Sequence, residues 1–304
     1  MIRKVLIPLD GSAFSEQALP LGLDLARRAD ATVVLVRVHQ PFFAVVPYAG
    51  TIPVDARWEE QIRDQEREEL ERTAQTLKER ADVEVEHHLL DGPVADAIER
   101  SARAQGADLI VMTTHGRGGL SRAWLGSVAD TLVRHSSIPL LLIRPGESKA
   151  ERVRPAPLQR ILVPLDGSSR AEAILPHAQD LARLTGAELV LIRVVIPRSG
   201  LGHAALDPSL PLERLEEEAH GEAVAYLRET ADRIGKAGTP VVFRVVHGDQ
   251  VALAILDQVG ALDADMIAMA TRGRGGVARL ILGSTADKVL RGTSVPLLII
   301  RPDE

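Results

Sequence analysis

Residues 116–130 read GRGGLSRAWLGSVAD, and residues 273–287 read GRGGVARLILGSTAD. Each stretch follows a short apolar run and leads into an amphipathic segment, which predicts a glycine-containing loop between a strand and a helix. Glycine lets the backbone approach a ligand closely, and the amides at the start of a helix attract anions. The repeated stretch therefore predicts two phosphate-binding loops.

The repetition extends over the whole chain of 304 residues. Asp10 recurs as Asp166, an offset of 156, and Gly126 recurs as Gly283, an offset of 157. Two copies of a unit the size of one domain are therefore present. We expect a first domain over residues 1–146, a linker of mixed charge with prolines over 147–157, and a second domain over 158–304.

Within each copy, apolar strand-like runs alternate with segments of helical periodicity. Strands are predicted over 3–9, 32–38, 83–90, 108–114 and 139–144, and over 160–165, 188–196, 240–247, 266–271 and 295–301. Helices are predicted over 15–28, 58–80, 93–105 and 127–135, and over 171–184, 212–236, 251–259 and 284–291. A loop with several prolines is expected over 41–53, and the charged helix 58–80 is expected to have a wide solvated face. Strands that are apolar along their length predict an α/β fold with a parallel sheet covered on both faces.

The composition disfavours several classes of protein. A net charge of -6 and 3% aromatic residues are a poor match to nucleic-acid binding. The chain has no cysteine, which excludes disulfides and thiolate chemistry. No apolar run approaches the roughly 18 residues of a membrane span, and the N-terminal apolar run is too short for a signal sequence. We expect a soluble cytoplasmic protein without a membrane partner. The histidines show no ligand spacing, so no metal site is expected.

Ligands of parallel sheets bind beyond the carboxyl ends of the strands. Asp10 and Asp166 follow the first strand of each copy, where a carboxylate would either hold ribose hydroxyls or cap the next helix. The sequence contains neither the P-loop motif Gly-x4-Gly-Lys-Ser/Thr nor the hydrolase motif Gly-x-Ser-x-Gly.

The helix that follows each glycine loop has a clear start signal. Ser127 and Ser284 are candidate N-caps, and Asp130 and Asp287 follow three residues later. The two aspartates either turn away from the loop as caps or hold a Mg²⁺ ion that bridges them to a phosphate.

These residues resemble the universal stress protein family in its tandem two-domain form, over nearly the whole chain. Nucleotide-binding members of that family have Gly-x2-Gly-x9-Gly-Ser/Thr at this loop, after an early aspartate. Both copies match the second and third glycines and the serine, whereas Thr113 and Ala270 stand in place of the first glycine.

The resemblance implies two tandem Rossmann-like domains, each an open five-stranded parallel sheet of order 3-2-1-4-5 sandwiched by helices. It implies an adenine nucleotide in each copy, ATP with or without Mg²⁺, whose ribose meets the early aspartate and whose adenine meets the end of the second strand. The implied contacts are Pro8, Asp10, Val38, Thr113, Gly116, Gly126, Ser127, Val128 and Ala129, and Pro164, Asp166, Val194, Ala270, Gly273, Gly283, Ser284, Thr285 and Ala286.

The resemblance also implies that residues 138–143 and 295–300 pair with each other. Both segments are short and apolar, and an open edge of that kind invites pairing. The chain would then be an intramolecular pseudo-dimer, and a homodimer of chains is also allowed.

Three functions are compatible with these residues. The leading one is an ATP-binding stress-response module that acts through nucleotide-dependent conformation and partner contacts, because the copies share no catalytic base: His115 is matched by Arg272. The second is a slow nucleotide hydrolase or a transferase of the adenine-nucleotide α-hydrolase type, with His115 or Asp130 as its base. The third is an interaction module that binds no nucleotide, because Ala270 departs from the family pattern.

Overall fold

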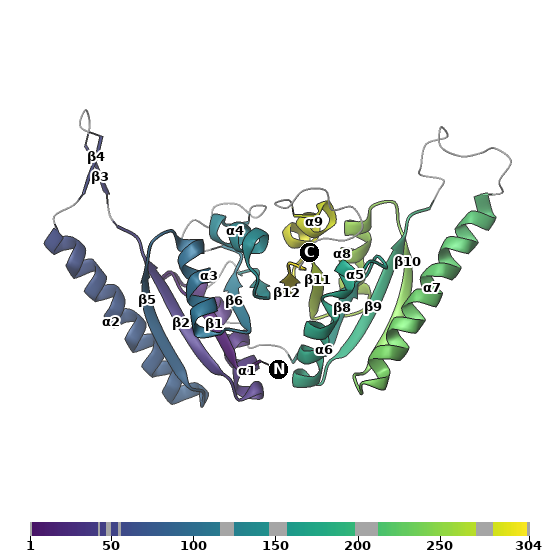
Figure 1. Ribbon diagram of the computed structural model, residues 1–304, viewed down its shortest axis with the longest axis horizontal. Helices are drawn as coiled ribbons and strands as arrows, with labels where there is room; N and C mark the ends of the chain where they lie inside the picture. The colour runs from purple at the N-terminus through teal and green to yellow at the C-terminus, as the bar shows by residue number, and fades with distance from the viewer. Residues whose placement is uncertain are drawn as a thin grey trace. The chain divides into compact units, whose positions relative to one another are not determined.

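The computed structural model describes residues 2–41, 43–46, 50–53, 56–115, 125–145, 157–197, 212–271 and 282–302. The described residues form two compact units (Figure 1). Unit 1 takes its residues from 2–115, from Leu125–Leu132 and from Pro145, and unit 2 takes its residues from Val133–Arg144 and from 157–302. The last strand of the first repeat therefore belongs to unit 2.

Four parallel strands form the sheet of unit 1, in the order β5-β2-β1-β6. They are β1 (Lys4–Pro8), β2 (Thr32–His39), β5 (Val85–Asp91) and β6 (Leu109–Thr113). The strands β1, β2 and β6 are almost entirely buried, whereas the edge strand β5 is partly exposed along its length. The near-continuous apolar runs are therefore the inner strands, as expected for a sheet covered on both faces.

Helices cover this sheet closely. They are the 3₁₀ turn η1 (Ser15–Ala18), α1 (Leu19–Ala29), α2 (Ala56–Ala81) and α3 (Val94–Gln105). Helix α2 packs on β2 and β5, and Figure 1 shows α3 on the other face of these strands. Helix α1 approaches β1 at Gly22, where an added Cβ would lie 2.6 Å from Ile7 Cδ1. The glycine thus permits the close contact between α1 and the sheet.

Unit 2 repeats this architecture. Its parallel strands lie in the order β10-β9-β8-β11-β12, which is 3-2-1-4-5 in the numbering of one repeat. They are β8 (Arg160–Pro164), β9 (Glu188–Val195), β10 (Val241–His247), β11 (Met266–Ala270) and β12 (Leu297–Ile300). Its helices are α5 (Ser169–Glu172), α6 (Leu175–Thr185), α7 (Leu212–Lys236), α8 (Val251–Ala261) and α9 (Ser284–Gly292). The predicted α/β fold and strand order are confirmed.

The first repeat ends with α4 (Ser127–His135) and β7 (Leu140–Ile143). Strand β7 pairs antiparallel with β12, with Leu141 opposite Leu298. Two arginines make related contacts, because Arg144 Nη1 donates to the Thr293 carbonyl at 3.4 Å and Arg301 Nη1 donates to the Arg134 carbonyl at 3.3 Å. The pairing predicted for 138–143 and 295–300 is confirmed, and it buries two apolar strands that would otherwise each have an open edge.

The structure corrects two predicted elements. The helices predicted over 15–28 and 171–184 are each divided, into η1 and α1 and into α5 and α6. Pro20 and Pro176 lie in the first turn of α1 and α6, because proline is tolerated there and not in a helix interior. The expected loop 41–53 contains an antiparallel hairpin of β3 (Phe43–Val46) and β4 (Gly50–Pro53).

Candidate functional site

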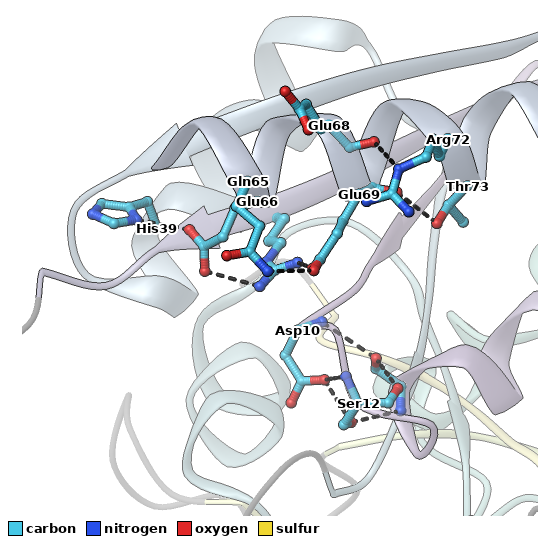
Figure 2. Close-up of polar contacts among 11 residues, drawn as sticks. Asp10, Ser12, His39, Gln65, Glu66, Glu68, Glu69, Arg72 and Thr73 are labelled. Atoms are coloured by element: carbon cyan, nitrogen blue, oxygen red, sulfur yellow. Dashed lines mark hydrogen bonds and ion pairs between the residues drawn. The ribbon is translucent and has the colours of Figure 1, made fainter. Parts of the chain in front are cut away.

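Both repeats end their first strand with Pro-Leu-Asp-Gly-Ser, and this sequence forms the same turn twice. Asp10 Oδ1 accepts hydrogen bonds from the backbone N–H of Ser12 at 2.9 Å and from its hydroxyl at 2.6 Å (Figure 2). Asp166 Oδ1 accepts the same two bonds from Ser168, also at 2.9 and 2.6 Å. The intervening glycines have φ of 78° and 80°, a conformation that glycine adopts without strain. Each turn thus orients a carboxylate just beyond the end of a strand.

The interpretation of these aspartates as helix caps is wrong. Ser168 is the N-cap of α5, and its hydroxyl accepts the Ala171 N–H at 3.1 Å. In the first repeat the Ser12 hydroxyl accepts the Ser15 N–H at 3.2 Å. The aspartate therefore holds the serine, and the serine begins the following turn of helix.

The strand register brings the predicted ribose and adenine contacts together. Pro8 pairs with Val36 and Leu6 with Ile110, so a continuation of both ladders would place Asp10 between Val38 and Thr114. The second repeat gives the same result. Pro164 pairs with Ile192 and Leu162 with Ile267, which places Asp166 between Val194 and Thr271. Carboxylate, strand end and loop start are thus neighbours at the carboxyl edge of each sheet.

The glycine before α4 contacts the end of β6 directly. Gly126 donates its N–H to the Thr114 carbonyl at 2.8 Å, and Gly283 donates to the Thr271 carbonyl at 2.9 Å. A Cβ added to Gly126 would lie 2.9 Å from the Thr114 oxygen, which is too close for any side chain. Glycine at this position therefore brings the start of the helix against the strand end.

The predicted N-caps are one residue too late. Gly283 is the N-cap of α9, with φ -59° and ψ 142°, and Ser284 is the first helical residue. Gly126 takes the same place before α4, since its carbonyl accepts the Asp130 N–H at 2.9 Å. The reason is that the glycine must leave helical geometry to reach the strand end. Ser127 and Ser284 are consequently exposed at the start of their helices.

The amides of the first helical turn have no acceptor within a helix. In α4 they belong to Ser127, Val128 and Ala129, and in α9 to Ser284, Thr285 and Ala286. Because the amides of Gly126 and Gly283 already donate to threonine carbonyls, these six are the amides that an anion at the helix starts would meet. The predicted contacts Gly116 and Gly273 lie outside the described residues.

The residues in place of the family's first glycine differ between the repeats. The Thr113 hydroxyl donates to the His115 carbonyl at 2.8 Å, whereas Ala270 has no hydroxyl with which to make this bond. Both residues are buried, at 5% and 7% exposure, so neither projects a large group beyond the strand. Pro8 and Pro164 are the last residues of β1 and β8 and are half-buried.

Asp287 turns along its own helix. Its carboxylate accepts the Arg291 Nε–H at 3.0 and 3.1 Å and lies 3.0 Å from Arg291 Nη2, an ion pair one turn apart. The sequence left two alternatives for this aspartate, a cap that turns away from the loop and a ligand of Mg²⁺. The contacts with Arg291 fit an aspartate that turns away from the loop, but its partner is Arg291 and not the backbone amide that a cap would bind.

A charged cluster beside the site was missed by sequence reasoning. Arg37 Nη2 donates to Glu66 Oε1 and Arg37 Nη1 donates to Glu69 Oε2, both at 2.9 Å (Figure 2). The side chain of Arg37 is 9% exposed and that of Glu66 is 12% exposed. The expected wide solvated face of α2 therefore lacks these two glutamates, which turn toward the sheet. The signal in the sequence was Arg37 and His39, which alternate with valines at the end of an otherwise apolar strand.

The second repeat holds its long helix differently. Arg193, in the place of Arg37, lies over the ring of Tyr226 with 5.3 Å between Cζ and the ring centroid. The Tyr226 hydroxyl donates to Glu172 Oε1 at 3.0 Å, and Arg233 Nη2 lies 2.6 Å from Glu172 Oε2. Burial and the neighbouring Glu172 raise the pKa of Tyr226 above its usual range. Tyr226 therefore stays neutral, whereas the partners of Arg37 in the first repeat are the carboxylates of Glu66 and Glu69.

The described part of the chain holds neither a metal-binding cluster nor a membrane-crossing helix. No group of three or more His, Asp or Glu side chains there could hold a metal ion. None of the described helices combines the length and the apolar character that crossing a membrane requires.

Comparisons with known proteins agree with this architecture. The sequence model of the Universal stress protein family matches residues 1–144 and 157–301. A universal stress protein of Mycolicibacterium smegmatis is 26% identical over 301 residues, covering 98% of this chain and 97% of that protein. Another, of Mycobacterium tuberculosis, is 27% identical over 308 residues, covering 98% and 96%. The crystal structure of a universal stress protein from Archaeoglobus fulgidus has a TM-score of 0.73 at 23% identity, over 98% of each chain. With two matches that together span nearly all of its length, the chain belongs to the universal stress protein family, in its tandem two-domain form.

Proposed function

We propose that each repeat binds one adenine nucleotide, ATP, at the carboxyl edge of its sheet. The observation that carries this proposal is the arrangement repeated at both edges. An oriented carboxylate lies beside a strand end, and a glycine holds the start of a helix against the neighbouring strand. Two copies that differ at many other positions keep this combination of groups.

The chemistry of each group suits one part of a nucleotide. The first-turn amides and the positive end of the helix dipole of α4 favour phosphate oxygens. The carboxylate of Asp10, an acceptor, suits the donor hydroxyls of ribose. Val38, half-buried at the end of β2, offers an apolar contact to adenine. In the second repeat Ser284 to Ala286, Asp166 and Val194 would do the same.

A Mg²⁺ ion bound with the phosphates would neutralise part of their charge, as it does in many nucleotide sites. Asp287, paired with Arg291, is not oriented for such an ion by its own contacts. In the second repeat the ion would therefore be carried mainly by the phosphates and water. Titrations with ATP in the presence and in the absence of Mg²⁺ test whether the ion contributes to the affinity.

We further propose that nucleotide binding acts through conformation and partner contacts in a stress response. The candidate base His115 is not repeated, since Arg272 corresponds to it, and Asp287, the counterpart of Asp130, is paired with Arg291. A module whose two sites bind the same ligand with different surroundings can respond to nucleotide level without turning it over. Partners, including a second copy of the chain, would then distinguish the loaded from the empty form.

Isothermal titration of the full chain with Mg-ATP tests the binding proposal. We expect two sites per chain, with dissociation constants well below about 1 mM. The variants Asp10→Ala and Asp166→Ala form a matched pair, and each should lose one of the two sites. If the wild-type chain bound neither ATP nor a related nucleotide at about 1 mM, the proposal would be wrong.

A slow hydrolase is the alternative, and Asp130 at the start of α4 is its candidate base in the first repeat. Steady-state phosphate release by the wild type and by Asp130→Asn separates the two functions. Turnover that the substitution abolishes, with ATP binding retained, would favour the enzyme. Binding without turnover in either chain supports the regulatory module.

A further inference from the structure

The end of β2 is anchored to α2 on both sides of Val38. Side chains alternate between the faces of a strand, so Arg37 and His39 point to the same face, where α2 packs. Both contact one carboxylate, because Glu66 Oε1 accepts from Arg37 at 2.9 Å and Glu66 Oε2 lies 2.7 Å from His39 Nδ1. The backbone that carries the proposed adenine contact is thus held by two residues that share one partner on a helix.

His39 is held in a place that suits its charged form. The side chain is 4% exposed, and its second ring nitrogen, Nε2, lies 2.6 Å from Glu59 Oε1. An ionised carboxylate only accepts hydrogen bonds, and a neutral imidazole has a single N–H. Both ring nitrogens can therefore donate only when His39 is an imidazolium.

The electrostatic surroundings also favour the imidazolium. Burial by itself lowers the pKa of His39, but the hydrogen bonds and charges of Glu59 and Glu66 more than offset it, so the pKa is raised above the ordinary value of 6.5. Asp91, the register partner of His39 on β5, is already paired with Arg63 of α2. The charged groups that face this corner are Arg37 of β2, Glu59, Arg63, Glu66 and Glu69 of α2, and Asp91 of β5.

Loss of the proton from His39 would change this balance. Four carboxylates face two guanidiniums, so the corner has a net charge of -2 without the imidazolium and -1 with it. A neutral ring keeps one N–H and can donate to only one of its two glutamates. The other carboxylate would be left against a ring lone pair, which favours movement of the first turns of α2 away from β2.

The second repeat provides an internal contrast. Val195 takes the place of His39 at the offset of 156, and Arg193 takes the place of Arg37. Arg193 contacts the ring of Tyr226, and Val195 is buried with 9% exposure and carries no ionisable group. The position of His39 thus carries no ionisable group in the second repeat, and the histidines of this corner, His247 of β10 and His220 of α7, contact each other, with 3.0 Å between their ring nitrogens, and not the end of β9 through a carboxylate.

We propose that the contacts of His39 with Glu59 and Glu66 form a pH-sensitive latch between β2 and the first turns of α2, which sets the nucleotide affinity of the first repeat alone. This inference rests on the proposed function, because it concerns the same nucleotide site. The latch is closed when His39 is protonated and opens when the pH rises. Because the pKa of folded His39 is raised, the latch contributes to stability at neutral pH and below, and this contribution is lost as the pH rises through the raised value. The two sites of one chain then respond differently to the same alkaline shift.

The affinity of each site is measured separately in full-length variants. The Asp166→Ala chain retains the first site, and the Asp10→Ala chain retains the second site. The measurements run from about pH 7 to about pH 9.5, which lies above the ordinary pKa of histidine. Over this range the ATP affinity of the first site should fall about tenfold, which corresponds to about 1.4 kcal/mol. The second-site chain, which experiences the same titration of ATP itself, should change by less than about twofold.

Two variants of the latch complete the test. His39→Val copies the second repeat, and in the Asp166→Ala background it should remove the pH dependence of the first site. Glu59→Gln removes one carboxylate while keeping the ring, and it should shift the fall in affinity to lower pH. An equal pH dependence with and without His39 would overturn the proposal, as would an equal dependence at the two sites.

A readout without nucleotide separates the latch from the proposed function. Nitrogen-15 NMR of the nine histidines, with His39 assigned by its loss in His39→Val, should show both ring N–H groups of His39 persisting at a pH where exposed histidines have lost one. Hydrogen exchange of residues 56–66 should rise with pH more than that of 212–224, and His39→Val should abolish the difference. A His39 ring that titrates with the exposed histidines would overturn the latch. If no chain bound ATP at any pH, the proposed function and the regulation of its site would both fail. The NMR and hydrogen-exchange measurements would still show whether protonated His39 holds the first turns of α2 against β2.

Discussion

Replacing Gly126 with alanine tests the contact on which the first candidate site depends. The new Cβ would lie 2.9 Å from the Thr114 carbonyl oxygen and 3.6 Å from the His115 Cα. Close carbon–oxygen contacts in proteins begin at about 3.3 Å, so the backbone must retreat by roughly 0.4 Å. Neither neighbour is a flexible side chain tip, because both atoms belong to the backbone. The start of α4 must therefore move away from the end of β6.

This movement strains the hydrogen bond from Gly126 to Thr114, which is 2.8 Å long. Weakening it should lower the free energy of unfolding by about 1 kcal/mol, measured by urea denaturation. Displacing the helix amides from the phosphates should weaken ATP binding at the first site about tenfold, while the second site retains its affinity. Gly283→Ala should produce the mirror result, since Gly283 makes the equivalent bond at 2.9 Å.

Isothermal titration of both variants with Mg-ATP, beside Gly221→Ala as a control for substitution in an exposed helix, gives the decisive comparison. An added Cβ at Gly221 meets nothing within 4 Å, so this control should leave both sites unchanged. The reasoning would be refuted if Gly126→Ala kept wild-type stability and bound two nucleotides with affinities within about twofold of the wild type.

Three further predictions concern stability. Gly221→Ala should raise the free energy of unfolding in urea by roughly 0.5–1 kcal/mol, because alanine restricts the unfolded chain and α7 has room for it; no gain would contradict this. Leu141→Ala, opposite Leu298, should cost about 2–5 kcal/mol because Leu141 is fully buried, and a cost below about 1 kcal/mol would mean that β7 is not packed. The hydrogen-bonded Arg63 lowers the pKa of Asp91, so this pair stabilises at neutral pH and its contribution is lost as the pH falls through the lowered value. In Asp91→Asn, the free energy of unfolding should therefore fall slightly less than in the wild type as the pH is lowered. The difference should be small because the pair is exposed. Identical profiles of unfolding free energy against pH in the two chains would contradict the contact.

Local patterns were sufficient for the elements that form the sheet. Apolar runs such as Val5 to Ile7 are buried strands because a parallel sheet covered on both faces tolerates only such residues. The first residues of α4 and α9 were predicted correctly, but their N-caps were predicted one residue late, since Ser284 has the composition of a cap but Gly283 occupies the position. The N-cap is the residue whose backbone leaves helical geometry. Here that residue is Gly283, because its N–H donates to the Thr271 carbonyl.

Local patterns were insufficient for the charged cluster at the end of β2. Helix α2 has glutamates along most of its length, and composition does not distinguish those that meet the sheet from those that face water. Glu59, Glu66 and Glu69 are selected by the packing of α2 on β2, which brings them to His39 and Arg37. These partners lie 20 to 32 residues apart, so no short sequence window contains both members of a pair.

By itself the sequence determined the duplication, the α/β class and the order of the elements, because each depends on residues that are close together or on periodicity within one segment. Only the tertiary structure decided the register in which β7 pairs with β12, the contact of Gly126 with Thr114, and the place of His39 between two glutamates. The physical reason is that these contacts join segments brought together by the folded chain, where burial and register select among many residues of the same chemical kind.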